Sequence, residues 1–221
     1  MKDRNKKRCR YMFENTYKIL KEEKAVAVIR TSTYEEAKEI SIAAIEGGIK
    51  IIEVTMSVPD APKLIKELKD KYNDVCVGAG TVLSKDNVDE CIENGTDFIV
   101  SPCLDEEVIG YANQRKVLVI PGLMTMSELN RAYKMGLRFI KVFPGSVVGK
   151  GFIGAAKSIF NDICIMPTGG VKKENIVEWI NAGADCSGIG SDLNKIYKTD
   201  GAYGVKEYCR LVKEEVKKTE K

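Results

Sequence analysis

Two ionisable residues lie inside apolar, strand-like runs of the sequence: Lys141 in the run FIKVF (139–143) and Glu53 in the run IIEVT (51–55). Burial in apolar surroundings makes an unpaired ammonium costly and favours the uncharged amine, which can attack a carbonyl carbon. Strand interiors are depleted in glutamate, and a carboxylate beside such a lysine can serve as general acid and base. We therefore predict Schiff-base chemistry, with Lys141 as the covalent nucleophile and Glu53 as the acid–base group.

The sequence of 221 residues contains no histidine. This excludes Ser-His-Asp and Cys-His catalysis, and it excludes zinc held by imidazole, the usual design of metal-dependent aldolases. Acid–base chemistry then falls to carboxylates, lysine, tyrosine, cysteine or water. Two structural alternatives remain open: Lys141 could extend its ammonium from the strand end into solvent, or it could pair with Glu53 only to stabilise the fold.

Two glycine-bearing turns favour a phosphorylated ligand: the segment PTGG (167–170) follows one apolar run, and the segment GIGS (188–191) follows the next. Glycines let backbone N–H groups approach a phosphate closely, and the N-terminus of a following helix attracts negative charge. The predicted substrate contacts in these turns are Thr168, Gly169, Gly170, Gly190 and Ser191.

The elements that position these residues are short apolar runs that alternate with amphipathic stretches. Such runs are typical of parallel strands that are covered on both faces. The stretches between them carry apolar residues at helical spacing, and a charged helix over 204–218 closes the chain. Glycines at the ends of several stretches suit left-handed helix C-caps: Gly48, Gly95, Gly136 and Gly183. The predicted strands cover residues 25–30, 49–55, 75–82, 98–103, 117–122, 139–145, 163–170 and 186–193.

Eight βα units in about 200 residues predict an α/β protein with one (β/α)8 TIM barrel. An open, doubly wound sheet is the alternative, but nothing in that architecture requires the count to stop at eight. In a barrel the chemistry lies where strands end and βα loops begin. Polar residues and glycines concentrate at those points, which nominates Arg30 and Thr81 together with the residues named above.

Length and composition indicate one soluble domain over residues 14–221, with N-terminal and C-terminal helices, preceded by a basic tail over residues 1–13. The net charge of +3 is too small to indicate nucleic-acid binding. No apolar run reaches the roughly 18 residues of a membrane span, and the N-terminus lacks the apolar stretch of a secretory signal. The seven scattered cysteines form no CxxC pair and fit reduced, buried thiols. We therefore expect a cytoplasmic protein that needs neither nucleic acid nor membrane.

The ordered motifs of the chain resemble those of the 2-keto-3-deoxy-6-phosphogluconate (KDPG) and 2-keto-4-hydroxyglutarate (KHG) aldolases and their 6-phosphogalactonate relatives. The resemblance runs from about residue 25 to about residue 193, and it is carried by GGIKIIEVT, VGAGTVL, FIVSP, FIKVFP, PTGGV and GIGSDL. It implies a class I aldolase on a TIM barrel, which acts without a cofactor or metal ion and commonly forms a homotrimer.

The resemblance also implies roles for single residues. The Schiff-base lysine of the family falls on Lys141, its proton-shuttling glutamate on Glu53, and the threonine that holds the pyruvyl carboxylate on Thr81. The two glycine turns match its phosphate-binding loops. Many members have an arginine just after the second strand, where this chain has Ser57; Arg30 resembles an arginine that other members use and could supply the missing charge.

The implied reaction is cleavage of KDPG to pyruvate and glyceraldehyde 3-phosphate. Aldolases for 4-hydroxy-2-oxoglutarate, for 2-keto-3-deoxy-6-phosphogalactonate or for an unphosphorylated sugar acid are the enzymatic alternatives, together with an oxaloacetate decarboxylase that uses the same iminium. A non-catalytic barrel that binds a phosphorylated metabolite is the alternative outside catalysis. The joint occurrence of Lys141 and Glu53 disfavours that last alternative.

Overall fold

The computed structural model describes residues 14–220, in which strands and helices alternate along the chain. The strands are β1 (Ala25–Ile29), β2 (Ile51–Thr55), β3 (Cys76–Gly80), β4 (Phe98–Ser101), β5 (Leu118–Leu123), β6 (Phe139–Val142), β7 (Cys164–Pro167) and β8 (Ser187–Ile189). The helices after the unlabelled helix over residues 14–23 are α2 (Tyr34–Glu46), α3 (Ala61–Lys71), α4 (Lys85–Glu93), α5 (Glu106–Arg115), α6 (Met126–Lys134), α7 (Gly145–Val148), α8 (Gly151–Ile159), α9 (Ile176–Asn181) and α10 (Ser191–Lys217), and a 3-10 turn (Lys218–Glu220) follows them.

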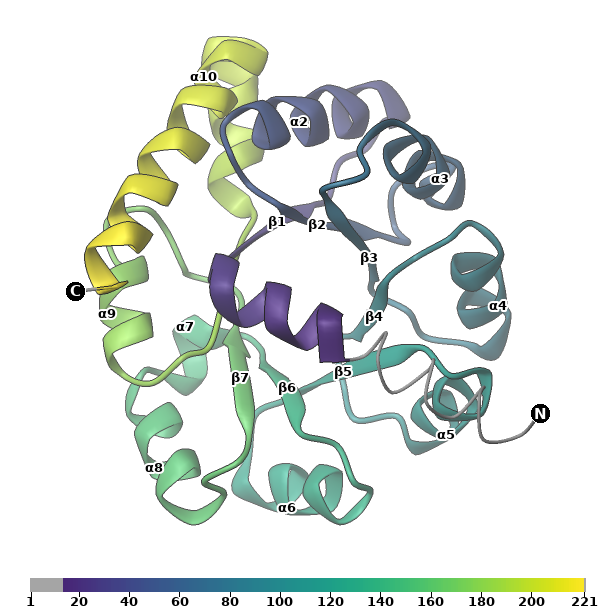
Figure 1. Ribbon diagram of the computed structural model, residues 1–221, viewed down its shortest axis with the longest axis vertical. Helices are drawn as coiled ribbons and strands as arrows, with labels where there is room; N and C mark the ends of the chain where they lie inside the picture. The colour runs from purple at the N-terminus through teal and green to yellow at the C-terminus, as the bar shows by residue number, and fades with distance from the viewer. Residues whose placement is uncertain (1–13, 221) are drawn as a thin grey trace.

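The strands form one parallel sheet that curves into a barrel, with the helices outside it (Figure 1). Each strand pairs with its neighbours in sequence, and β1 also pairs with β8. A single bridge between Thr168 and Gly188 joins β7 to β8 and completes the ring. This arrangement confirms the predicted (β/α)8 barrel and excludes the open, doubly wound sheet.

The apolar strands supply two cores because side chains alternate between the faces of a strand. On β1, Val26 and Val28 belong to the cluster inside the barrel, whereas Ala25, Ala27 and Ile29 belong to the cluster between barrel and helices. The large rings that fill the interior include those of Phe98 and Phe139. The residues of both cores are almost fully buried, and close packing of such cores gives the strand ends that carry the polar residues a rigid base.

The helix ends follow the local signals of the sequence. Thr125 and Glu128 form a capping box at the start of α6. The four glycines that were predicted as C-caps all have positive φ angles, between 83° and 106°. That prediction is confirmed, and it explains why the chain turns back sharply into the next strand.

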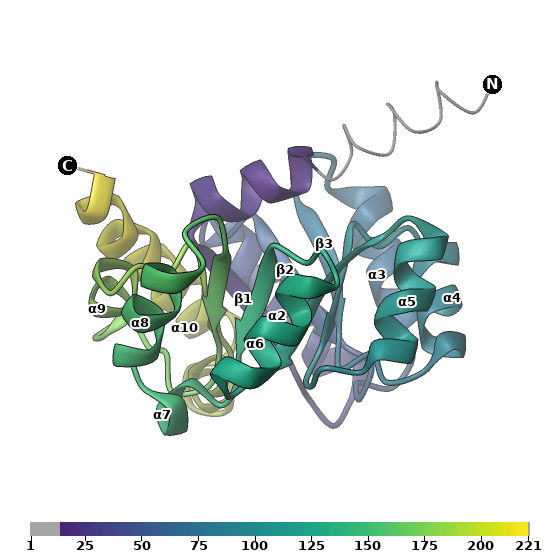
Figure 2. The same cartoon turned by 90° about the horizontal axis from the view of Figure 1, so that it is seen from below.

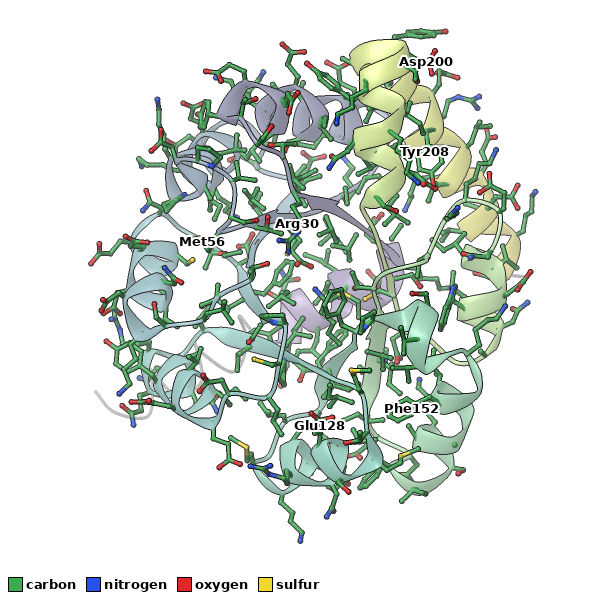
Figure 3. All side chains as sticks on the ribbon, turned by 180° about the vertical axis from the view of Figure 1, so that it is seen from behind. Arg30, Met56, Glu128, Phe152, Asp200 and Tyr208 are labelled. Carbon is green, nitrogen blue, oxygen red and sulfur yellow. The ribbon has the colours of Figure 1, made fainter. Side chains whose placement is uncertain are left out.

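The helix over residues 14–23 lies across the mouth at the N-terminal ends of the strands (Figures 1 and 2). Its Leu20 is buried in the barrel interior, and the ring of Tyr17 meets the ring of Phe139 edge-on, with centroids 5.2 Å apart. The opposite mouth, at the C-terminal ends of the strands, is the one seen in Figure 3, and Arg30 lies there. The fold therefore leaves one mouth for a substrate.

The strand predictions identified every strand but ran past most of their ends. The clearest error is the run 186–193, because β8 ends at Ile189 and α10 already begins at Ser191. The helix predicted over 204–218 is confirmed as the second part of α10, which follows a break at the non-helical residue Gly201; the first part, which begins at Ser191, was not predicted. The basic tail expected over 1–13 lies outside the described residues. Among residues 14–220, no helix has the length and apolar character to cross a membrane.

Candidate active site

Lys141 on β6 and Glu53 on β2 meet inside the barrel, although they lie on strands that are not neighbours in the sheet. The lysine Nζ is 3.4 Å from the glutamate Oε1, and their side chains are only 6% and 1% exposed. Room for this pair comes from Gly80 on β3, where an added Cβ would lie 2.3 Å from the carboxylate oxygen. A glycine at position 80 is therefore needed for the carboxylate to reach the lysine.

The second carboxylate oxygen of Glu53, Oε2, is buried and has no hydrogen-bond partner in the structure. A buried acceptor without a donor costs free energy, about 1–3 kcal/mol for a neutral group and more for a charged one. No contact within the fold compensates for this cost. The orphan oxygen fits a group that accepts or returns a proton from a bound molecule.

The surroundings of Lys141 exclude one of the two alternatives left open by the sequence. Its ammonium does not extend into solvent, because the residue is 5% exposed and Nζ lies 5.1 Å from the centroid of the Phe143 ring. The ion pair with Glu53 is present, but it does not exclude catalysis. A shift of one proton from Nζ to the carboxylate gives a neutral amine beside a carboxylic acid, which removes both buried charges.

A cavity of about 620 Å³ opens above Lys141 at the C-terminal mouth. It brings together every predicted site residue except Glu53, which lies behind the lysine. The predicted residues that line it are Arg30, Thr81, Lys141, Thr168, Gly169, Gly170, Gly190 and Ser191.

One side of the cavity carries a guanidinium. Arg30 donates from Nη2 to the Thr81 hydroxyl at 2.7 Å and from Nη1 to the Ser57 hydroxyl at 3.1 Å. Thr81 has φ +59°, a left-handed conformation that is strained for a β-branched residue. Its hydroxyl accepts from Arg30, so its own proton is available to an anion in the cavity. Arg30 and Thr81 together can hold a carboxylate next to Lys141.

The other side of the cavity is formed by the two glycine turns. Gly170 has φ +82°, and an added Cβ would lie 2.7 Å from the Cβ of Ser146. Asn175 braces this turn, since its side chain donates to the Gly170 carbonyl at 2.9 Å and accepts from the Lys172 N–H at 2.8 Å. The second turn leads directly into the first part of α10, which runs from Ser191 to the break at Gly201, so the positive N-terminal end of this helix faces the cavity.

Thr168 occupies the floor between these two sides. It is 7% exposed, and its hydroxyl is buried and has no hydrogen-bond partner in the structure. Gly188 lies opposite, and a Cβ there would come within 2.5 Å of that hydroxyl. The unpaired hydroxyl can serve a substrate hydroxyl that lies between the reacting carbonyl and the phosphate turns.

The cavity also has lining residues that were not predicted as site residues, among them Pro102, Phe143 and Asn194. Phe143 shares the inward face of β6 with Lys141, so strand alternation was a signal for it. Pro102 follows β4, another strand end. Asn194 had no such signal, because the sequence interpretation did not place a helix there.

A larger hollow of about 990 Å³ lies at the opposite end of the barrel, between the helix over 14–23 and the segment around Arg138. It contains one thiol, Cys164, whose pKa burial raises to about 11. A thiol with that pKa is protonated at neutral pH and is a poor nucleophile. Among the described residues that line the hollow there is also no buried lysine–carboxylate pair, so the smaller cavity is the candidate active site.

Comparison with known sequences identifies the family. The sequence model described as KDPG and KHG aldolase matches residues 16–202. The 2-dehydro-3-deoxy-6-phosphogalactonate aldolase of Escherichia coli (strain K12) is 36% identical over 170 residues, which are 76% of this chain and 83% of that protein. The KHG/KDPG aldolase of the same strain is 32% identical over 158 residues, 70% of this chain and 73% of that protein.

Solved structures agree with this result. The structure titled "Native KDPGal structure" is 30% identical, with a TM-score of 0.80 over 88% of this chain and 95% of that chain. The KDPG aldolase of Legionella pneumophila, with pyruvate captured at low pH as a covalent carbinolamine intermediate, is 28% identical, with a TM-score of 0.78 over 86% and 93%. The chain belongs to the KDPG and KHG aldolase family of carbon–carbon lyases.

Proposed function

We propose that this protein cleaves KDPG to pyruvate and glyceraldehyde 3-phosphate through a Schiff base on Lys141. The observation that carries the proposal is the buried contact between Lys141 and Glu53, 3.4 Å from nitrogen to oxygen, beneath a cavity that also contains two glycine turns. A nucleophile and an acid–base group within reach of each other are what Schiff-base catalysis requires.

The first half of the reaction makes an iminium. Transfer of one proton from Lys141 to Glu53 leaves a neutral amine, which adds to the C2 carbonyl carbon of the substrate. Glu53 returns the proton to the carbinolamine hydroxyl, which leaves as water. The relative from Legionella pneumophila, with pyruvate held as a covalent carbinolamine, supports this step.

The second half breaks the carbon–carbon bond. The Glu53 carboxylate removes the proton of the C4 hydroxyl, directly or through a water molecule, and C4 becomes the aldehyde of glyceraldehyde 3-phosphate. The electrons of the C3–C4 bond move into the iminium and give an enamine. Glu53 then protonates C3, and water hydrolyses the new iminium to release pyruvate and Lys141. The iminium is the electron sink throughout.

The two ends of the substrate fit the two sides of the cavity. Arg30 and Thr81 take the C1 carboxylate next to the lysine. The turns at Gly169 and Gly190, with the start of α10, take the phosphate through backbone N–H groups and the Ser191 hydroxyl. The unpaired hydroxyl of Thr168 lies between these ends and fits a hydroxyl of the sugar chain.

The C4 epimer, 2-keto-3-deoxy-6-phosphogalactonate, is the second candidate substrate, since the 36% identical relative from E. coli bears the name of that activity. Cleavage of 4-hydroxy-2-oxoglutarate is a third candidate, because the family description includes KHG. Cleavage of each of these substrates passes through the same iminium, so the substrates differ only in the contacts that the protein makes beyond C3.

The deciding test is a coupled assay of pyruvate release, with NADH and lactate dehydrogenase, on a panel of phosphorylated and unphosphorylated 2-keto-3-deoxy sugar acids and 4-hydroxy-2-oxoglutarate. We expect the highest kcat/KM on KDPG. A higher kcat/KM on the galactonate epimer would show that this epimer is the preferred substrate, and it would leave the proposed mechanism unchanged. No cleavage of any of them supports a non-catalytic barrel instead.

We also propose that the protein is a homotrimer of the cytoplasm. A designed protein cage made by fusing symmetric oligomeric domains contains a chain that is 30% identical, with a TM-score of 0.81 over 89% of this chain and 73% of that chain. Light scattering after size exclusion should give three times the mass of the chain, and a monomer mass would contradict the proposal. Fractionation of the source cells tests the location.

A further inference from the structure

Ser57 lies two residues after the end of β2, at the position where the resemblance noted in the sequence leads one to expect an arginine. It is exposed, and its hydroxyl has two hydrogen-bond neighbours: Arg30 Nη1 at 3.1 Å and the Thr55 hydroxyl at 2.9 Å. The Thr55 hydroxyl in turn lies 2.9 Å from the carbonyl oxygen of Ile29. Four groups from β1 and β2 therefore form one hydrogen-bonded chain.

The donors and acceptors of this chain can have only one order. A carbonyl oxygen only accepts, so Thr55 uses its single proton on Ile29. Thr55 must then accept from Ser57, which spends the single proton of Ser57. The oxygen of Ser57 is left to accept from the guanidinium of Arg30, which only donates. Both hydroxyl protons of the chain are thus matched to an acceptor.

The series of hydrogen bonds that starts at the Arg30 guanidinium ends at the residue next to Arg30. Ile29 is the residue directly before Arg30, so the guanidinium is tied through Ser57 and Thr55 to the end of its own strand. Thr55 is fully buried and cannot move away. Thr81 holds the other side of the guanidinium through Nη2. A long, exposed side chain with many rotamers is thereby fixed at two points before any substrate arrives.

We propose that Ser57 is a positioning residue: through Thr55 it aims Arg30 at the substrate carboxylate. The inference rests on the proposed function, because it supposes that Arg30 receives that carboxylate. Two of the five N–H groups of the guanidinium are used on Ser57 and Thr81, and three remain for the anion. Pre-ordering of a binding group lowers the entropy cost of binding. Ser57 therefore helps to hold Arg30 in the position in which it binds the carboxylate.

The test compares Ser57→Ala with Ser57→Thr, which keeps the hydroxyl. Loss of one hydrogen bond to an exposed cation should raise KM about threefold to tenfold and leave kcat within about twofold. The pyruvate concentration for half-maximal borohydride trapping on Lys141 should rise by the same factor. Ser57→Thr should restore both values. Ser32→Ala, an exposed serine of the loop after β1 that does not line the cavity, is the matched control and should behave like the wild type.

A double-mutant cycle with Arg30→Met separates positioning from a general effect on the fold. If Ser57 acts through Arg30, Ser57→Ala should change KM little in the Arg30→Met background. Thr55→Val, which removes the buried member of the chain, should raise KM as Ser57→Ala does. Unchanged KM in Ser57→Ala, or an equal effect with and without Arg30, overturns the inference. Failure of the wild type to form the Lys141 adduct overturns the proposed function instead.

Discussion

Among the described residues, the nitrogen of Lys141 has one hydrogen-bond partner, the carboxylate of Glu53, and the side chain lines the cavity. Pyruvate with borohydride should therefore add one adduct, and peptide mapping should find it on Lys141. Lys141→Ala should abolish cleavage by at least about 10³-fold while the chain stays folded, because no other amine lines the cavity among the described residues.

Lys134→Ala supplies the control for this prediction, since Lys134 is an exposed lysine of α6, far from the cavity lining. It should keep the adduct and the full rate. An adduct on a different lysine, or full activity of Lys141→Ala, contradicts the assignment of the nucleophile.

Glu53 has two oxygens in different situations, one against Lys141 and one without a partner. Glu53→Gln keeps the shape but removes proton transfer. It should still form some pyruvate iminium but slow carbon–carbon cleavage by roughly 10²–10⁴-fold, the usual range for general acid–base catalysis. Exchange of the pyruvate methyl protons with solvent, followed by NMR, should slow as well. Wild-type rates of both exchange and cleavage would leave Glu53 a structural role only.

At the scale of the elements, we propose that the turn after β7 and the turn that starts α10 bind the phosphate. Ser191→Ala removes one hydroxyl donor at the first residue of that helix. A hydrogen bond to a charged group contributes about 1.5–3 kcal/mol, so kcat/KM on KDPG should fall roughly tenfold to a hundredfold. The slow reaction with small unphosphorylated 2-keto acids should barely change.

Gly170→Ala is a second probe of the same turns. An alanine there meets both a positive φ and the Cβ of Ser146 at 2.7 Å, so the turn must shift away from the phosphate. It should also lose efficiency on the phosphorylated substrate selectively. Equal preference of the wild type for substrates with and without phosphate would refute the phosphate assignment and favour 4-hydroxy-2-oxoglutarate.

The strands could be predicted because each is a short apolar run that ends in polar residues or glycine. The barrel followed from their number, and the strand ends located the cavity. The start of α10 could not be predicted, because GIGSDL continues an apolar run and nothing local indicates where extended backbone becomes helix. The helix begins at Ser191 because the glycine turn closes the barrel there.

The site residues could be named one by one, but their contacts could not. Lys141 and Glu53 lie 88 positions apart, and their 3.4 Å contact depends on the curvature of the whole sheet. The contact of Arg30 with Ser57 depends on the neighbouring ends of β1 and β2. Sequence patterns predict which residue types lie on which face of a strand. Distances between residues on opposite sides of the barrel depend on how the sheet closes.

At the scale of the whole molecule, the two ends of the barrel differ: the N-terminal ends of the strands are covered by a helix, and the C-terminal ends open into the cavity. The helix over 14–23 seals one end with Leu20 and Tyr17, so that end is a packed core (Figure 2). The open end holds the strained Thr81 and the unpaired oxygens of Glu53 and Thr168. At this mouth a bound ligand could supply the missing hydrogen-bond partners.

The burial of several cysteine side chains should make the stability of the fold sensitive to high pH. Burial raises the pKa of five thiols, to about 12 for Cys91 and Cys209, to about 11 for Cys164, and further for Cys76 and Cys186. These thiols stay protonated in the folded chain, while in the unfolded chain they ionise near pH 8.5. Their contribution to stability is therefore complete below that pH and is lost as the pH rises towards the folded-state pKa values.

Five such groups give a steep dependence of stability on pH. Once the unfolded thiols are ionised, each thiol that stays protonated in the fold should lower the free energy of unfolding by up to about 1.4 kcal/mol per pH unit, with a smaller contribution from Cys164, the least buried of the five. A domain with an ordinary stability of about 5–15 kcal/mol should then unfold cooperatively within roughly two pH units above pH 8.5. Urea unfolding under reducing conditions at pH 7 to 10.5 measures the slope. Cys209→Ala should flatten it by about one fifth, whereas Cys103→Ala, at an exposed thiol, should leave it unchanged. A stability that is constant between pH 8 and 10.5 would contradict the burial of these thiols in the unperturbed fold.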